Sequence, residues 1–142
     1  TVRHCISLKF LLPYLSKNVM SIAIHVACDN EIFRKSIAAL LECNEKLEVR
    51  RTSPQGSRGV EEVRKTDPDV LVLAVPPKED IATHATWYRE TLPNAGIVGF
   101  CFVPEQAKGY RKANIDEIVY SHHTSADFFD AIKRVDDARN NS

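Results

Sequence analysis

The sequence has no excess of charge of either sign and no long hydrophobic run. Its 142 residues include 19 Lys and Arg against 19 Asp and Glu, so the formal net charge is zero. A segment that grips nucleic acid needs a basic surface for the phosphates, so we expect this segment to bind no nucleic acid by itself. Without an apolar run of about 18 residues or a polybasic patch, we also expect no membrane attachment.

Paired cysteine motifs are missing as well. None of the four cysteines belongs to a C-x-x-C pair, so the sequence carries no signature of a zinc site or a thioredoxin-like site. These cysteines are Cys5, Cys28, Cys43 and Cys101. A chain of this length with 44% hydrophobic residues can bury a core without disulfides. We therefore expect reduced thiols, a cytoplasmic location and no bound metal.

Glycine is scarce, and it is missing where nucleotide-binding folds need it. The chain has five glycines, and none lies in the turn Ala27–Glu31 after the first apolar run. A dinucleotide site needs glycine at such a turn so that the backbone can approach the phosphates. We therefore expect no cofactor. Because no nucleophile stands beside a base at any predicted strand end, we also expect no enzymatic activity.

From Ser21 onward, short apolar runs typical of strands alternate with stretches of helical periodicity. The predicted strands are Ile22–Ala27, Leu47–Thr52, Asp69–Val75, Gly96–Val103 and Ile115–Tyr120. The predicted helices are Glu31–Glu42 after an Asn30 cap, Gly59–Thr66, Glu79–Thr91, Pro104–Lys112 and a last helix capped by Ser125. This alternation predicts an α/β fold, a flavodoxin-like, doubly wound, five-stranded parallel sheet in the order 2-1-3-4-5.

The chain divides into three parts. We interpret residues 1–20 as an N-terminal extension, either upstream or non-native sequence, residues 21–138 as one domain, and residues 139–142 as the start of a polar linker. The first helix is predicted from apolar residues that recur at helical spacing; they are Ile32, Phe33, Ile37, Leu40 and Leu41.

Several short motifs within this frame resemble the receiver domains of bacterial response regulators. The resemblance is strongest to the LuxR-output (NarL/FixJ-type) subfamily, whose receivers precede a helix-turn-helix, and it covers about residues 22–135. The motifs that carry it are Ala27–Leu41, the Gln55-Gly56 turn, Pro68–Leu73, Leu92–Ala95 and Ala131–Val135. The resemblance implies a CheY-like form of the predicted fold and a signalling role.

The residues that the resemblance assigns to phosphoryl transfer are mostly replaced. Ala74 stands where the family has its phosphoacceptor aspartate, and Cys28 and Asp29 stand where it has two magnesium-binding acids. The hydroxyl residue that would contact the phosphoryl group aligns with Cys101, and the lysine of the last strand aligns with Ser121. A methyl group accepts no phosphoryl group, and one carboxylate beside a thiol is a poor magnesium site. We therefore expect a degenerate receiver, or pseudo-receiver.

This interpretation predicts a phosphorylation-independent domain of a two-component transcription regulator. It would act by homodimerisation or by binding a protein partner, and DNA would be bound by an output domain outside this segment. The alternative is a flavodoxin-like sensor that binds a small molecule in the altered pocket, because Cys28, Ala74 and Cys101 make it more apolar. An enzyme of the same fold has the least support.

Some residues carry further expectations. The resemblance implies an interface role for a group near the fourth helix, fifth strand and fifth helix, namely Tyr110, Ile118, Tyr120 and Phe128. Ile118 aligns with the family's aromatic switch residue. From the residues themselves, we expect Asp29 to orient the first loop and His25 to be a hydrogen-bonded core histidine. His122 and His123 are expected in a solvated loop.

Overall fold

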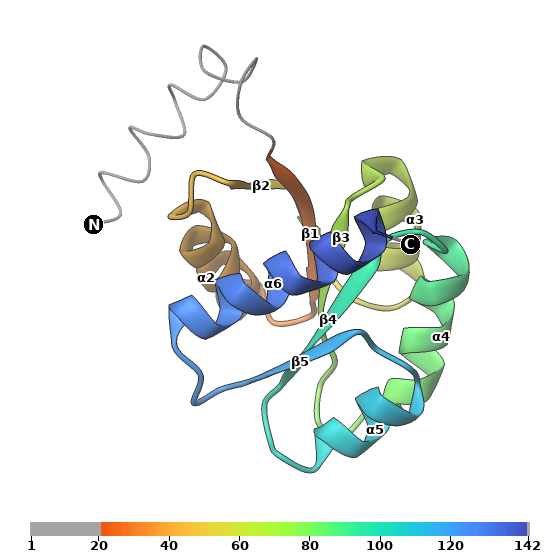
Figure 1. Cartoon of the computed structure of the whole chain (residues 1–142). Coiled ribbons are helices and arrows are strands. Elements are labelled where there is room, and N and C mark those ends of the chain that lie inside the picture. The colour runs from red at the N-terminus through yellow and green to blue at the C-terminus, as the bar shows by residue number, and fades with distance from the viewer. Residues whose placement is uncertain (1–20, 142) are drawn as a thin grey trace.

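A five-stranded parallel sheet lies between two helical layers in the computed structural model, which describes residues 21–141 (Figure 1). The strand order is β2-β1-β3-β4-β5, which confirms the predicted fold. The strands are β1 (Ile22–Cys28), β2 (Leu47–Ser53), β3 (Val70–Ala74), β4 (Gly96–Cys101) and β5 (Glu117–Tyr120). The helices are α2 (Glu31–Glu42), α3 (Ser57–Thr66), α4 (Ile81–Thr91), α5 (Gln106–Lys112) and α6 (Ser125–Asn140).

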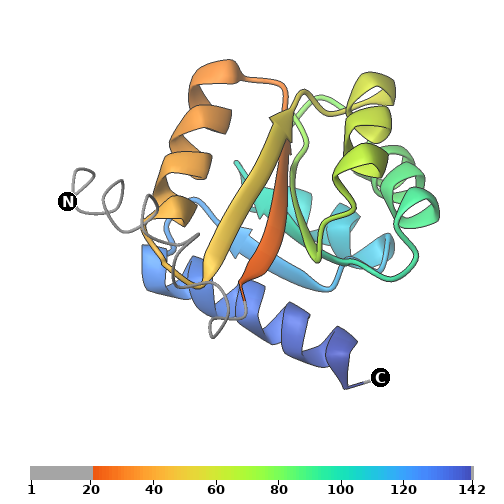
Figure 2. The ribbon, with the colours of Figure 1, turned by 90° about the horizontal axis from the view of Figure 1, so that it is seen from above.

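The two faces of the sheet are covered by different helices (Figure 2). Helices α2 and α6 pack on one face, and α3, α4 and α5 pack on the other. Strand β3 is buried along its whole length, and its successive side chains enter the two layers in turn. A strand buried on both faces must be apolar throughout, which is why Val70–Ala74 contains only aliphatic side chains.

Hydrogen bonds from nearby side chains set the ends of two elements. Strand β4 ends at Cys101 rather than Val103, because Gln106 Oε1 accepts the N–H groups of Phe102 and Val103 at 2.7 and 3.3 Å. The cap of α6 is Thr124 rather than Ser125: its hydroxyl accepts the Asp127 N–H, and the Asp127 carboxylate accepts the Thr124 N–H. This reciprocal pair is a capping box.

The apolar side of α2 is narrower than the sequence pattern suggests. Asn30 caps the helix as expected, accepting the Phe33 N–H at 2.8 Å. Ile37 and Leu41 are buried, but Ile32 is 80% exposed and Leu40 is 37% exposed. The predicted helix is confirmed, and these last two side chains are exposed because the helix contacts its neighbours along one narrow i, i+4 ridge.

Two of the four expected interface side chains lie in the interior. Tyr110 is 0% exposed and Phe128 is 4% exposed, so each packs inside the domain, on opposite faces of the sheet. The expectation of a surface position is therefore wrong for both, because their rings supply bulk to the two cores. Ile118 and Tyr120 are partly exposed.

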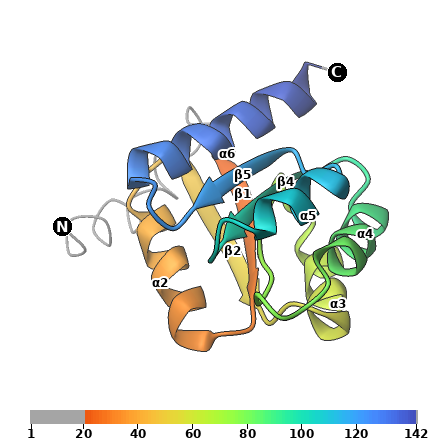
Figure 3. The same ribbon diagram turned by 90° about the horizontal axis from the view of Figure 1, so that it is seen from below.

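The last turn of α6 is fixed to the edge of the sheet where the strands begin (Figure 3). Asp69 Oδ2 accepts the Ala23 N–H at 2.8 Å, and Arg139 donates to Asp69 Oδ1 and to Asp136. Because α6 continues through Asn140, the linker expected from residue 139 falls partly inside the helix. No helix among residues 21–141 is long and apolar enough to cross a membrane.

Candidate functional site

Three of the predicted site residues meet at the edge where the strands end. Cys28 and Ala74 are register partners at the ends of β1 and β3, and Asp29 follows directly. They border a hollow of about 260 Å³, whose remaining walls are Asn30, Pro76, Pro77 and Phe102. The parallel sheet thus brings these residues together because parallel strands end at one edge.

Cys101 and Ser121 are not among the walls of this hollow. Cys101 ends β4 with its side chain in the layer of α3, α4 and α5, where burial raises the pKa of its thiol to about 11. Ser121 is exposed in the turn after β5. The five aligned positions are therefore spread along the strand-end edge.

The Cys28 thiol is buried and protonated. It is 1% exposed, and burial raises its pKa. Its sulfur lies 3.8 Å from the Asn30 carbonyl oxygen, while Arg34 donates to the Cys28 carbonyl at 2.7 Å. A buried neutral thiol is a weak nucleophile and a poor ligand for a hard cation.

The Mg²⁺ ion that the receiver resemblance implies does not fit these residues. Magnesium takes an octahedron of oxygen ligands, and this edge offers a thiol at Cys28 and a methyl group at Ala74. The one remaining carboxylate, Asp29, is already hydrogen-bonded twice by Gln55. Residues 21–141 also contain no cluster of three or more His, Cys, Asp and Glu side chains that could hold a metal.

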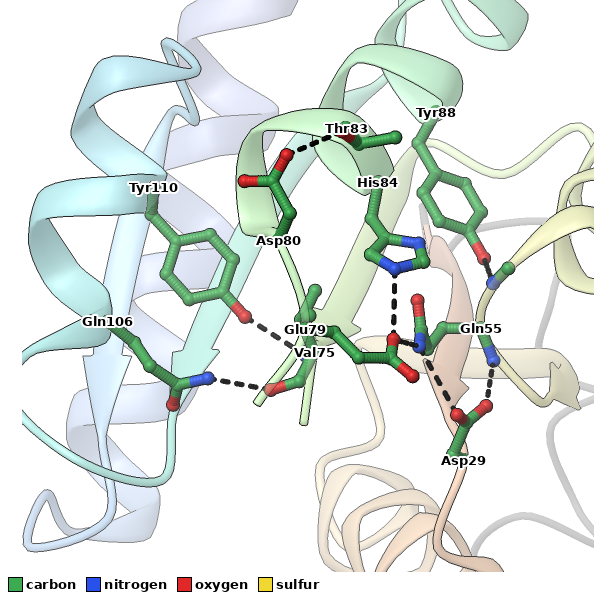
Figure 4. A network of polar contacts seen from close by, with 11 residues as sticks. Asp29, Gln55, Val75, Glu79, Asp80, Thr83, His84, Tyr88, Gln106 and Tyr110 are labelled. Carbon is green, nitrogen blue, oxygen red and sulfur yellow. Dashed lines mark hydrogen bonds and ion pairs between the residues drawn. The ribbon is translucent and has the colours of Figure 1, made fainter. Parts of the chain in front are cut away.

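A polar network beside the hollow ties three strand-end loops together (Figure 4). The backbone N–H of Gln55 donates to Asp29 Oδ1 at 3.0 Å, and its side-chain Nε2 donates to Asp29 Oδ2 at 3.2 Å. The same Nε2 donates to Glu79 Oε2, which also contacts His84 Nε2 at 2.9 Å. The loops after β1, β2 and β3 are thereby joined through one amide group.

Gln55 is the buried centre of this network, whereas the carboxylates Asp29 and Glu79 are exposed. Gln55 is 7% exposed, and its Oε1 is buried without a hydrogen-bond partner, as is Nδ1 of His84. Tyr88, fully buried in α4, accepts the Gly56 N–H with its hydroxyl oxygen at 3.1 Å. Burial raises the pKa of Tyr88. Hydrogen bonds to ionised carboxylates are stronger than neutral ones, so the contacts of Gln55 fix this turn firmly.

Helix α5 holds the neighbouring loops from the other side. Gln106 Nε2 donates to the Val75 carbonyl at 2.7 Å, and Tyr110 accepts the Val75 N–H at 3.1 Å. The Tyr110 hydroxyl also donates to the Phe100 carbonyl at 2.9 Å. Because every one of these contacts reaches backbone, the chain after β3 has little freedom to rearrange.

The network residues were not predicted from the sequence. Gln55 follows β2 within two residues. Because sites in parallel sheets lie where the strands end, this position is the one signal that points to Gln55. No signal in the sequence distinguishes Glu79 or His84 from ordinary surface residues. Asp29 does orient a loop as expected, but the loop is that of Gln55 rather than its own.

The histidines behave as expected. His25 is buried, with its ring nitrogens 3.0 Å from Thr66 Oγ1 and 2.8 Å from Ser53 Oγ, which confirms a hydrogen-bonded core histidine. His122 is exposed in the loop after β5, and its ring stacks on Tyr120. His123 Nδ1 accepts the Tyr120 N–H at 3.1 Å, so this ring closes the turn.

No family model matches the chain, and no curated protein sequence matches it significantly. Its fold, by contrast, recurs in many solved response-regulator domains. The receiver domain of AraT, a response regulator from Geobacillus stearothermophilus, matches with a TM-score of 0.70 at 20% identity, over 86% of this chain and 98% of that one.

Two further structures show the same likeness. A LuxR-family two-component response regulator from an Aurantimonas species has a TM-score of 0.74 at 20% identity, over 84% of this chain and 87% of that one. The receiver domain of NarL from Mycobacterium tuberculosis has a TM-score of 0.65 at 18% identity, over 86% of this chain and 98% of that one. The chain therefore has the CheY-like fold of response-regulator receiver domains, including those of LuxR-type regulators.

Proposed function

We propose that this domain is a pseudo-receiver of a transcription regulator, a signalling domain that transmits its state without phosphoryl transfer. It acts in the cytoplasm by homodimerisation or by contact with a protein partner, has no catalytic activity, and controls an output domain outside this segment. Solved proteins of the same fold include a LuxR-family DNA-binding response regulator and a response regulator, RcsB, in complex with DNA. This domain has zero net charge, so DNA contact belongs to the output domain.

The observation that carries the proposal is Ala74 at the end of β3. Its methyl group lies in the wall of the hollow, at the position where the receiver resemblance requires a nucleophilic carboxylate. A methyl group has no lone pair with which to attack a phosphorus atom. Cys28 in the same wall is a buried neutral thiol, and both oxygens of the neighbouring Asp29 carboxylate accept hydrogen bonds from Gln55, so neither group replaces the missing carboxylate at the end of β3.

The direct test offers the domain a phosphoryl donor. Acetyl phosphate with Mg²⁺ should leave the intact mass unchanged, and beryllofluoride with Mg²⁺ should leave the amide NMR signals of Asp29, Ala74 and Val75 in place. A phosphorylatable receiver treated in parallel serves as the positive control. A stoichiometric gain of one phosphoryl group would refute the proposal.

A second candidate is a small-molecule sensor, favoured by the hollow itself. Its walls are mainly apolar, with Ala74, Pro76, Pro77 and Phe102 beside the buried Cys28 thiol. Apolar walls with few polar groups are typical of small-molecule sites. Thermal-shift screening with apolar metabolites should find a ligand whose effect is lost in the Phe102→Ala variant. A ligand with equal effects on both proteins would bind elsewhere.

A further inference from the structure

Two carboxylates from different loops share one amide nitrogen. The side-chain Nε2 of Gln55 carries two hydrogens; one points to Asp29 Oδ2 at 3.2 Å and the other to Glu79 Oε2. In Figure 4 the amide lies between the two acids, with its nitrogen on their side. The loops after β1 and β3 thus meet through a neutral group from the loop after β2.

The orientation of this amide is set by the acids alone. Gln55 is 7% exposed, and its Oε1 is buried without a partner. A buried acceptor without a donor is unfavourable, and native structures seldom retain one. Here the arrangement is kept because both N–H donors are needed at the carboxylates, where each forms a charge-assisted hydrogen bond.

Two carboxylates that approach one point repel each other, and hydrogen-bond donors or a positive group between them offset this repulsion. A divalent cation is the usual solution at a loop junction, since it draws oxygen ligands from several segments. We propose that the Gln55 amide takes the place of a divalent cation between Asp29 and Glu79, and so holds the three loops in one arrangement without metal. This inference rests on the proposed function, because a metal-free domain needs a substitute at this junction.

His84 completes the arrangement. Its Nε2 lies 2.9 Å from the Glu79 oxygen that the amide contacts, so this oxygen receives two partners. If the amide were removed, Asp29, Glu79 and His84 would have to shift toward one another to hold an ion, because as they stand they form no metal-binding cluster. Carboxylate oxygens with one imidazole nitrogen suit Mn²⁺ and tolerate Mg²⁺. The amide would then be what keeps these ions out of the natural protein.

The test removes the two N–H donors and asks whether a cation replaces them. We expect the Gln55→Ala variant to bind Mn²⁺ at least roughly tenfold more tightly than the natural protein does. Broadening should appear at the amide NMR signals of Asp29, Gly56 and Glu79. With about 10 mM MgCl₂ at constant ionic strength, the Tm of the variant should rise by about 5 °C, and that of the natural protein by less than about 1 °C.

The double variant Gln55→Ala with Asp29→Asn is the matched control, and its gain in Mn²⁺ binding should be lost. Equal Mn²⁺ binding by the natural protein and Gln55→Ala would overturn the proposal, as would a folded Gln55→Ala variant without any gain. If the variant does not fold, hydrogen exchange at the backbone amides of the natural protein tests the proposal. Protection of residues 29, 55 and 79 should be the same in EDTA and in Mg²⁺, and slower exchange in Mg²⁺ would refute the inference. Neither refutation touches the acetyl phosphate test, which depends on Ala74.

Discussion

His25 illustrates how one buried side chain makes stability depend on pH. The Thr66 hydroxyl donates to the Glu62 carbonyl at 2.9 Å, so it accepts from His25 Nδ1, and His25 Nε2 accepts from Ser53. The neutral ring thus has a hydrogen-bond partner at each nitrogen. Burial, assisted by the positive charge of Arg51, lowers the pKa of His25 to about 4.

The unfolded chain binds a proton at this histidine near pH 6.5, whereas the folded chain does so only near pH 4. Stability is therefore complete above pH 6.5 and falls as the pH decreases toward 4, by at most about 3 kcal/mol. Urea unfolding across this range should show the loss in the natural protein and a flatter dependence in the His25→Gln variant. Parallel pH dependences would contradict the assignment.

How well the role of a single residue can be predicted from the sequence depends on the kind of residue. His25 alternates with apolar neighbours, and a histidine in such a strand predicts a buried, hydrogen-bonded ring. Asp29 was predicted to orient the first loop, but it orients the loop after β2 instead. Gln55 and Glu79 could not be predicted as partners, because their contact depends on how two loops approach after folding.

Among the elements, β4 shows why a strand can require glycine. A Cβ at Gly99 would lie 2.6 Å from Tyr110 Cδ1, and the Tyr110 ring is held by its hydroxyl contacts to Val75 and Phe100. Because the ring cannot retreat, Gly99→Ala should lower the free energy of unfolding by about 2–3 kcal/mol.

Gly109 in α5 is the matched control, since its added Cβ would meet Ile81 Cβ at 3.2 Å and alanine favours the helix. Urea unfolding should show Gly109→Ala within about 1 kcal/mol of the natural protein. If both variants lost the same free energy of unfolding, the loss in Gly99→Ala would not come from the contact with Tyr110.

The start of α6 allows a test of which residue caps the helix. The capping box makes Thr124, and not Ser125, the residue that satisfies the first turn. Thr124→Ala should therefore cost about 1 kcal/mol of stability, while Ser125→Ala should stay within about 0.5 kcal/mol. Thermal unfolding of both variants, with Thr124→Ser as the conservative control, checks this. A larger loss at Ser125 would restore the sequence-based assignment.

The type and order of the elements could be predicted, because hydrophobic periodicity and turn residues are local signals. The residues at which the elements begin and end were predicted less accurately. Strand β4 stops where Gln106 takes over its N–H groups, and Thr124 and Ser125 are equally good caps by residue type. In each case a contact made by the folded chain decides between neighbouring residues.

For the whole molecule, the proposed function makes association independent of phosphate. With Ala74 in place of an acceptor, no phosphoryl group attached at the end of β3 can shift a monomer–dimer equilibrium. Analytical ultracentrifugation should give the same dissociation constant with and without acetyl phosphate and Mg²⁺. A change of roughly tenfold, equal to about 1.4 kcal/mol, would show that the pocket still responds to a phosphoryl donor.

The ion pair between Arg139 and Asp69 has a consequence for how the two ends of the sheet are connected. It fixes the last turn of α6 where β3 begins, whereas the hollow lies where β3 ends. At about 3.3 Å per residue, these points are about 16 Å apart along five residues of a stiff, fully buried strand. Because this ion pair joins the last turn of α6 to the start of β3, any displacement of β3 along its own axis would carry the end of α6 with it.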